Sequence, residues 1–287
     1  MSDDLGGRPN AAGDEADLVA RAVDGDRAAL AEVIALLQDP LYRLALRMTG
    51  RPADAEDAVQ EIMIRVLTRL ATWRGEAKLL TWAYRVGVNY LLNLRRQSPQ
   101  ERQQLSLDDF RDDLAEGLAA EDYRGPEATL LTEEVRLGCT QAMLQCLSRD
   151  ERVAFVLGDV FDLKAAEAAW ILRISPAAFQ KRLERAKQRL ATFLRSTCGL
   201  ADAKALCRCS RRVDRAIELG RVQPRRPAFA QHPVSPGGRT VAAAAAQMLT
   251  LRDAAGVIRV HPDYAAPQAK IDAITGLLHS GRFPLLD

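Results

Sequence analysis

The sequence predicts an all-α protein, with two helical domains joined by an acidic linker and followed by a small, mostly helical C-terminal extension. Apolar residues recur at helical spacing through most of residues 14–196, and no strand-like alternation of any length occurs there. Ala, Leu, Arg, Glu and Gln, which are strong helix formers, dominate the middle of the chain. Residues 98–131 lose this periodicity, which divides the helical part into two domains.

The bulk composition is that of an ordinary soluble protein, with 48% hydrophobic and 27% charged residues. Met1–Asp17 is acidic and polar, unlike a secretory signal. No apolar stretch approaches the roughly 20 residues that cross a bilayer. The five cysteines are an odd number in a chain unlike a disulfide scaffold. We therefore expect a cytoplasmic protein without membrane contact, and a disordered tail over residues 1–13.

The first domain is expected over residues 14–97. Helical spacing begins at Asp14 and continues to Leu37. Pro40 is expected to break or kink the helix, because proline cannot donate a backbone hydrogen bond. A second apolar stripe follows and is expected to stop at Gly50.

The rest of this domain is expected to form two more helices. Arg51-Pro52-Ala53-Asp54 begins the first, because proline suits the first helical turn and acidic residues suit the positive end of the helix dipole. Trp73–Glu76 is expected to be a short turn. The last helix is predicted from Leu79 to Arg96.

Charge is distributed unevenly along the chain. Residues 100–134 hold eleven acidic residues against three arginines, whereas residues 171–196 hold seven Lys or Arg against the single acid Glu184. A chain with such segments often binds nucleic acid with the basic one and keeps the acidic one solvated. Two ordinary solvated helix faces are the other interpretation.

The sharpest local pattern is a helix-turn-helix at Leu163–Leu190, inside a second domain expected over residues 132–196. Lys164–Leu172 forms the first short helix. In the turn that follows, Ser175 is a good N-cap and Pro176 a good first helical residue. In a helix-turn-helix, the second helix enters the major groove of DNA by its N-terminal end.

The second helix carries side chains suited to DNA. Gln180 and Arg182 have the chemistry to reach base edges. Phosphates suit the other cations, which are Lys181, Arg185, Lys187 and Arg189. Many helical hairpins share this pattern, so the spacing alone leaves a simple packed hairpin open.

Taken together, the two helical domains resemble the extracytoplasmic-function (ECF) sigma factors of the sigma-70 family. Three segments in the family's order carry the resemblance: Asp54–Glu61, the stretch from Trp73 through Trp82 to Arg96, and Ile174–Leu190. The resemblance covers residues 14–196. It implies a non-enzymatic subunit that binds core RNA polymerase and directs promoter-specific transcription initiation.

The resemblance also implies roles for individual residues. The sigma-2-like domain would contact polymerase through an exposed acidic face formed by Asp54, Glu56, Asp57, Gln60 and Glu61. It would recognise and melt the −10 element, trapping unstacked bases, with Arg74, Lys78, Arg85, Asn89, Asn93, Arg95 and Arg96. The sigma-4-like domain would read the −35 element with Ser175, Phe179, Gln180, Lys181, Arg182, Arg185, Lys187 and Arg189.

The chain departs from the family's pattern at three places. Arg173 stands where the family usually has a turn glycine, so a left-handed conformation there would cost about 1 kcal/mol. Trp170 occupies a usually polar position and is expected to pack on another element, such as the C-terminal extension. Ala178-Phe179-Gln180 replaces the commoner Thr-Val-Lys, so the promoter sequence does not follow from relatives.

The linker, residues 98–131, resembles the family's domain connector, which threads the RNA channels of the polymerase and need not fold alone. The extension, residues 197–287, lies outside the resemblance. It contains two stretches with helical spacing, around Val241–Ala254 and Ala266–Ser280. Some ECF groups carry an extension that replaces a separate anti-sigma factor. We therefore hypothesise a regulatory module that docks on one or both sigma domains, and otherwise a separate anti-sigma partner.

Three of the five cysteines lie in the extension, at Cys198, Cys207 and Cys209. They could bind zinc with a fourth ligand such as His232 or His261, although the spacing lacks the paired Cys-x2-Cys of common zinc folds. They could instead form a redox-sensitive disulfide, or be buried thiols. No other cofactor is expected, and Cys139 and Cys146, seven apart on one helical face, are interpreted as core residues.

Two rival functions belong to other classes. A free-standing helix-turn-helix regulator would bind DNA without polymerase, but the acidic Asp54–Glu61 helix and the −10-like segment argue against it. An enzyme is disfavoured because the sequence has no Gly-rich phosphate loop and no nucleophile elbow, and its three histidines are scattered.

Overall fold

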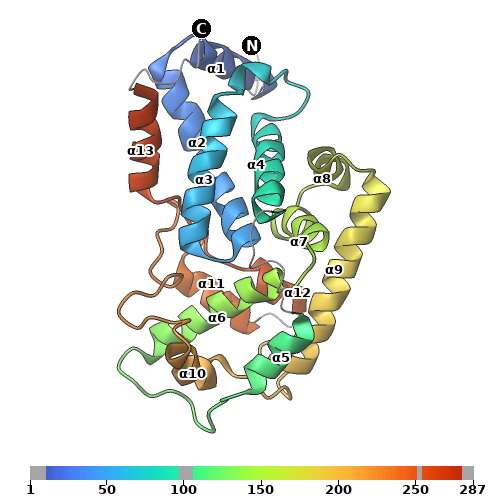
Figure 1. The fold of residues 1–287 in the computed structure, drawn as a ribbon, viewed down its shortest axis with the longest axis vertical. Helices are drawn as coiled ribbons and strands as arrows, with labels where there is room; N and C mark the ends of the chain where they lie inside the picture. The colour runs from blue at the N-terminus through green and yellow to red at the C-terminus, as the bar shows by residue number, and fades with distance from the viewer. Residues whose placement is uncertain (1–10, 97–105, 251–253, 280–287) are drawn as a thin grey trace, which may run out of the picture.

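The computed structural model describes residues 11–96, 106–250 and 254–279 (Figure 1). Within these ranges the regular secondary structure is helical, apart from two isolated backbone bridges. None of the helices in these ranges is both long enough and apolar enough to span a membrane. The predicted all-α fold class is therefore confirmed.

The first domain is a bundle of four helices. They are α1 (Ala11–Val23), α2 (Arg27–Thr49), α3 (Pro52–Leu67) and α4 (Leu79–Arg96), with a 3-10 turn at Leu70–Thr72. The central helix, α2, packs against the other three (Figure 1). The predicted start at Pro52 and the predicted span of α4 are confirmed.

Local sequence determines both ends of α2. The Asp26 carboxylate accepts hydrogen bonds from the N–H groups of Ala28 and Ala29, at 2.8 and 3.2 Å. Gly50 ends the helix in the left-handed conformation, with φ of 78°. Pro40 lies inside the helix. The expected break at Pro40 is wrong, because α2 continues to Thr49.

The predicted linker contains a helix, α5 (Leu107–Ala115), which the sequence reasoning did not expect. Ser106 and Asp109 form a capping box at its start. Leu107, Phe110 and Leu114 point into an apolar cluster beneath α9. The last predicted linker residues already belong to α6, and residues 97–105 lie outside the described part.

The second domain contains the predicted helix-turn-helix. Its helices are α6 (Ala128–Gln145), α7 (Arg149–Phe155), which continues as a π turn through Val156–Val160, α8 (Ala165–Leu172) and α9 (Pro176–Thr197). Between α8 and α9, Arg173 has φ of 56° and ψ of 44°. The predicted left-handed arginine is confirmed.

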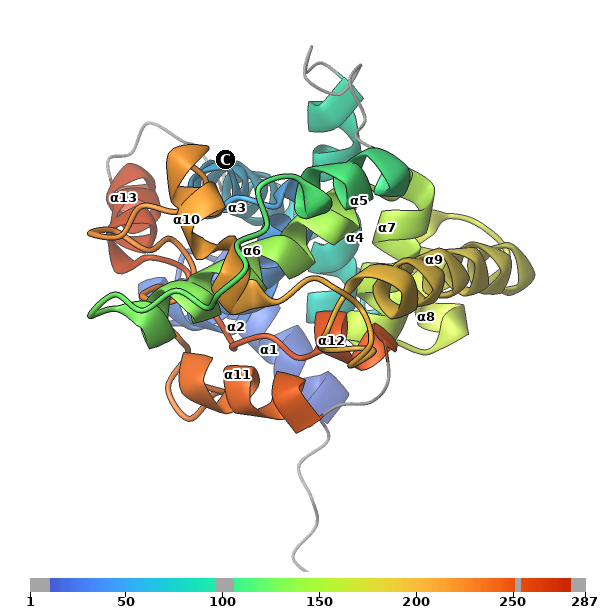
Figure 2. The ribbon, with the colours of Figure 1, turned by 90° about the horizontal axis from the view of Figure 1, so that it is seen from below.

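The extension lies against both domains. Its elements are a 3-10 turn at Cys209–Arg212, α10 (Val213–Glu218), α11 (Val241–Thr250), α12 (Ala254–Arg259) and α13 (Gln268–His279). Helix α13 packs beside α3, α12 packs beside α9, and α10 and α11 flank α6 (Figures 1 and 2).

One apolar core joins all three parts of the chain. It contains Leu41 of the first domain, Val153 of the second, and Tyr264 and Ile274 of the extension. The extension therefore docks on both domains, as hypothesised. In this conformation the two domains are packed together.

Candidate polymerase and promoter interfaces

The acidic face of α3 is exposed because the helix is amphipathic. Ala55, Ala58, Val59 and Ile62 are buried in the bundle, which turns the polar residues outward. Asp54, Asp57 and Glu61 are exposed, and Glu56 and Gln60 are half-buried. The five residues predicted to contact polymerase therefore share one accessible face.

The extension reaches this acidic face. Lys270 of α13 donates to Asp57 through Nζ and Oδ1, 2.7 Å apart. Burial raises the pKa of Glu56, while the nearby Lys270 opposes that rise. A partner that binds the acidic face must therefore compete with Lys270.

Several residues predicted to act at the −10 element line one open pocket of about 370 Å³, between the 3-10 turn and α4. Arg74, Arg85 and Asn89 contribute polar groups, and Trp73 and Trp82 contribute aromatic rings. The Trp73 Nε1–H donates to the Ala77 carbonyl at 3.0 Å, which orients the ring. Aromatic, cationic and amide groups around one hollow are suited to an unstacked base.

Four other predicted −10 residues do not line this pocket. Lys78 and Asn93 are exposed. Arg95 and Arg96 form the last turn of α4, and their side chains lie outside the described part of the structure.

The second domain supplies the far wall of the pocket, through Trp170 and Arg173. The Arg85 guanidinium carbon lies 4.4 Å from the centre of the Trp170 ring. Tyr84 stacks on Phe161 nearby, with ring centres 5.3 Å apart. Trp170 thus packs on another element, as expected. That element belongs to the first domain, so the suggested partner, the extension, is wrong.

The start of α9 follows from its cap. The Ser175 hydroxyl accepts a hydrogen bond from the Ala178 N–H at 3.2 Å, so it is engaged in capping. Phe179 is 1% exposed and belongs to the core. The expectation that Phe179 faces DNA is therefore corrected. Gln180, Lys181 and Arg185 are exposed.

The remaining α9 cations that were predicted to contact DNA pair with acidic residues of the same domain. Lys187 lies 3.0 Å from the almost fully buried carboxylate of Asp159. The other two pairs are Arg182 with Asp150, at 3.2 Å, and Arg189 with Glu151, at 2.5 Å. Within the described residues, Lys181 and Arg185 form no such pair. Together with the exposed Arg195 in the last turn, these two side chains make the most available cationic surface on α9.

A buried arginine joins the two domains. Arg152 is fully buried and donates to the carbonyl oxygens of Met48, Leu144, Gln145 and Leu147, at 2.7–3.1 Å, and to the Gln145 side chain at 2.7 Å. These carbonyls lie at or just beyond the C-terminal ends of α2 and α6. The negative ends of two helix dipoles therefore surround one cation.

A buried carboxylate anchors the extension. Glu134 of α6 is 2% exposed and accepts three backbone hydrogen bonds, from Ala228, Phe229 and Ala230, at 2.8, 2.9 and 2.7 Å. A carboxylate so surrounded by donors forms strong, directional bonds. Neither Arg152 nor Glu134 was predicted. The contacts that join separate parts of the chain, from Arg152 to Met48 and from Glu134 to residues 228–230, are made to backbone groups far away in sequence.

Both histidines proposed as zinc ligands are used in docking. His232 stacks on Tyr42 of α2, with ring centres 5.1 Å apart. His261 is buried against Thr140 and Gln141 of α6. Burial lowers the pKa of both rings, which keeps them neutral. Both side chains are engaged in contacts with the two sigma domains. The structure therefore does not support a histidine as the fourth zinc ligand.

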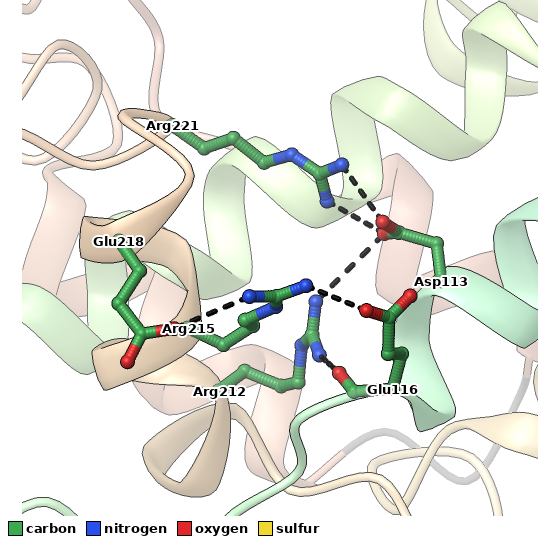
Figure 3. Close-up of polar contacts among 6 residues, drawn as sticks. All are labelled: Asp113, Glu116, Arg212, Arg215, Glu218 and Arg221. Atoms are coloured by element: carbon green, nitrogen blue, oxygen red, sulfur yellow. Dashed lines mark hydrogen bonds and ion pairs between the residues drawn. The ribbon is translucent and has the colours of Figure 1, made fainter.

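The acidic linker is bound by arginines of the extension (Figure 3). Arg221 forms a two-bond fork to Asp113, at 2.6 and 2.8 Å. Arg215 lies 2.7 Å from Glu116, and Arg212 donates to the Glu116 carbonyl at 2.5 Å. The hydrogen bonds and charge of Arg221 lower the pKa of Asp113. The linker's negative charge is therefore partly neutralised within the chain.

These features together define a helical DNA-binding protein: a helical bundle, a capped helix-turn-helix and a basic surface on α9. Comparison with known proteins narrows this class. The family model for sigma-70 region 2 matches residues 33–100, and that for sigma-70 region 4 matches residues 137–190. Neither match extends past residue 190, so the extension lies outside both.

Curated relatives agree with the family models. The ECF RNA polymerase sigma factor SigF of Caulobacter vibrioides is 32% identical over 183 residues, which are 63% of this chain and 94% of SigF. The ECF sigma factor SigE of Mycolicibacterium smegmatis is 30% identical over 174 residues, which are 59% of this chain and 64% of SigE. A solved structure of CnrH in complex with the cytosolic domain of CnrY is 23% identical, covers 63% of this chain and 96% of that chain, and has a TM-score of 0.43.

The chain belongs to the ECF family of RNA polymerase sigma factors. Members of this family direct RNA polymerase to promoters, and the chain is a transcription regulator of that kind.

Proposed function

We propose that this sigma factor acts in the cytoplasm, without chemistry of its own, and that its C-terminal extension holds it in a closed state that cannot engage a whole promoter. In the open state, the acidic face of α3 binds core RNA polymerase. The first-domain side of the pocket, with Arg74, Arg85 and Asn89, is uncovered when Trp170 and Arg173 move away, and it binds a base of the melted −10 element. The exposed N-terminal half of α9, with Gln180, Lys181 and Arg185, reads the −35 element.

The contact between Arg85 and Trp170 carries the proposal. The −10 and −35 elements are about 25 base pairs apart, which is roughly 85 Å of DNA at about 3.4 Å per base pair. Helix α4 and helix α8 touch, with 4.4 Å between the Arg85 guanidinium and the Trp170 ring. Helix α9 follows α8 after the turn at residues 173–175 and is about 33 Å long at about 1.5 Å per residue, so the two reading surfaces lie much closer together than 85 Å. The domains must move apart before both can bind.

The extension supports the closed state from three sides. It covers the joint between the domains, with the Arg47 guanidinium of α2 donating to the Ile258 carbonyl at 3.2 Å. It occupies part of the polymerase face through Lys270. It also binds the acidic linker through Arg221. These contacts favour the packed arrangement until a competing partner or signal releases them.

Run-off transcription with purified core polymerase on a library of genomic fragments tests the proposal. Trp170→Ala removes the ring over Arg85, worth about 0.5–2 kcal/mol, and should shift the closed–open equilibrium by roughly 2- to 30-fold. We therefore expect higher transcript yield than wild type at limiting protein. Leu206→Ala, at an 81% exposed position, is the matched control.

Two results would contradict the proposal in different ways. Failure of the wild-type chain to bind core polymerase in a pull-down, together with binding to DNA alone, would favour the free-standing regulator. Equal transcript yields from Trp170→Ala and Leu206→Ala would leave the sigma activity intact and refute the closed state.

A further inference from the structure

Four of the five cysteines converge from three parts of the chain. Cys139 lies on α6, Cys198 caps the C-terminal end of α9, and Cys207 and Cys209 belong to the extension. All four are free thiols. The fifth cysteine, Cys146, donates its thiol hydrogen to the Ala142 carbonyl oxygen, with Sγ and oxygen 3.4 Å apart.

The backbone brings these residues together. Cys198 and Cys207 form an isolated parallel bridge, which places their side chains on the same side of the two segments. The Gly199 N–H donates to the Cys207 carbonyl at 3.1 Å and secures that bridge. Cys209 opens the 3-10 turn that packs on α6, the helix of Cys139.

Each thiol is close enough to affect the others. Burial is the main cause that raises the pKa of Cys139, and Cys198, Cys209 and Cys207 add to it. Burial and then Cys209 and Cys198 raise the pKa of Cys207 to about 12. Burial and then Cys198 raise the pKa of Cys209 to about 11. Packing also brings these residues together, because Cys139 and Cys207 both pack against the apolar cluster that contains Cys198.

Three arginines lie near the cluster: Arg212, which pairs with Asp113, and Arg136 and Arg208. Burial raises the pKa of Cys198, Cys207 and Cys209, and neighbouring arginines only oppose that rise. Arg136, which is 8% exposed, does so at Cys198 and Cys209, and Arg208 does so at Cys198 and Cys207. Neither arginine forms an ion pair with a carboxylate in the described ranges. The Nε of Arg136 also lacks a hydrogen-bond partner there. A buried cation without a counter-charge is costly, so the site calls for negative charge beside it.

We propose that Cys139, Cys198, Cys207 and Cys209 bind one thiophilic divalent cation of the zinc class as a four-thiolate site. Four thiolates satisfy the tetrahedral preference of Zn²⁺. The complex has a net charge of −2, which the neighbouring arginines offset. Each thiol releases its proton to solvent as its sulfur bonds to the metal, and no electron is transferred.

Metal binding would require the four side chains to rearrange. Within the described residues, no three His, Cys, Asp or Glu side chains yet surround a common point at metal-binding distance. A cysteine has one side-chain torsion, and a change of its staggered rotamer moves the sulfur by about 3 Å. A disulfide is the weaker alternative, because it would use two sulfurs and leave Arg136 without a counter-charge.

The proposed site goes beyond promoter binding. It would join α6 and the end of α9 to residues 207–209 of the extension, whereas Glu134 of α6 holds residues 228–230. A bound metal would therefore stabilise the docked extension, because the free energy of metal binding adds to that of the folded state.

Titration of the reduced, metal-free, full-length chain with Co²⁺ tests the site. We expect one equivalent to bind, with sulfur-to-cobalt charge-transfer absorption and the strong visible bands of tetrahedral coordination, and Zn²⁺ to displace it. Cys139→Ser and Cys207→Ser should each weaken Co²⁺ binding at least tenfold, since even outer-shell changes cost about 10–100-fold. Cys146→Ser is the matched control and should bind Co²⁺ like wild type.

The wild-type titration can refute the proposal even if a variant fails to fold, and far-UV circular dichroism will identify such a variant. Absence of the charge-transfer absorption in wild type overturns the four-thiolate site. So does wild-type affinity in folded Cys139→Ser, or an equal loss of affinity in Cys146→Ser. None of these results bears on polymerase binding, which the transcription assay measures.

Discussion

The three hydrogen bonds of Glu134 allow a quantitative test of how the extension is held. Each bond joins a charged acceptor to a backbone donor, a type worth about 1.5–3 kcal/mol. Because such values do not add fully and water can enter, we expect Glu134→Ala to weaken docking by about 4 kcal/mol. The loss of docking free energy should destabilise the extension first, because the partners of Glu134 lie at Ala228–Ala230.

Glu134→Gln should have a smaller effect, for a geometric reason. One carboxylate oxygen accepts from both Phe229 and Ala230, and the other accepts from Ala228. A glutamine oxygen can replace the first, but its NH₂ group would then face the Ala228 N–H, donor against donor. We expect a loss of about 2 kcal/mol.

Hydrogen–deuterium exchange measures both variants at the relevant amides. A loss of about 4 kcal/mol should accelerate exchange at Ala228–Ala230 by roughly 10³-fold, and a loss of about 2 kcal/mol by roughly 30-fold. Glu133→Gln, one residue away and without these bonds, is the control. Unchanged exchange in Glu134→Ala, or equal acceleration in Glu133→Gln, would refute the reasoning.

Three further outcomes follow from contacts described above. Arg152→Met leaves several buried carbonyls without a donor and should lower the free energy of unfolding in urea by about 3–5 kcal/mol, whereas the exposed Arg185→Met should change it by less than about 0.5 kcal/mol. The pKa of Asp113 is lowered in the folded chain, so its contribution is present above its ordinary pKa of 3.8 and is lost as pH falls through the lower folded value. Exchange of α5 amides should therefore rise below about pH 4 in wild type, and Asp113→Asn should lack that acid-dependent rise. Lys181→Ala and Arg185→Ala should each reduce the salt dependence of promoter binding by about one phosphate contact, whereas Lys204→Ala should not.

Local signals predicted most of the two sigma domains. The start of α3 at Pro52, the Gly50 stop and the left-handed Arg173 follow from the conformational limits of single residues. Helix α4 follows from a strong apolar stripe. Such features need no knowledge of the rest of the fold.

The errors arise where other forces outweigh the local pattern. The acidic run of the linker concealed α5, although Ser106 and Asp109 form a capping box and Phe110 lies within an apolar stripe. Helix α2 continues through Pro40 because its flanking turns are buried in the bundle on both sides. Phe179 was assigned to DNA by its neighbours in sequence, but packing places it in the core.

Docking of the extension was hypothesised, but the partner residues of long-range contacts could not be predicted. Cys139 was interpreted as a core residue because its neighbours at Cys198, Cys207 and Cys209 are about sixty to seventy positions away in sequence. The partners of Trp170 and Glu134 are equally remote. Sequence patterns report the environment of a helix face, and they do not identify which segment covers it.

The buried hydrogen bonds of Arg152 and the exposed ion pairs of the extension should respond differently to ionic strength. Its charge is held by carbonyl dipoles in a dry interior, where dissolved ions do not reach. The Arg215–Glu116 and Lys270–Asp57 pairs face solvent, where added salt weakens attraction. Rising salt should therefore weaken the contacts at the periphery of the extension. The contact of Arg152 with Met48, which joins the two domains, should change little.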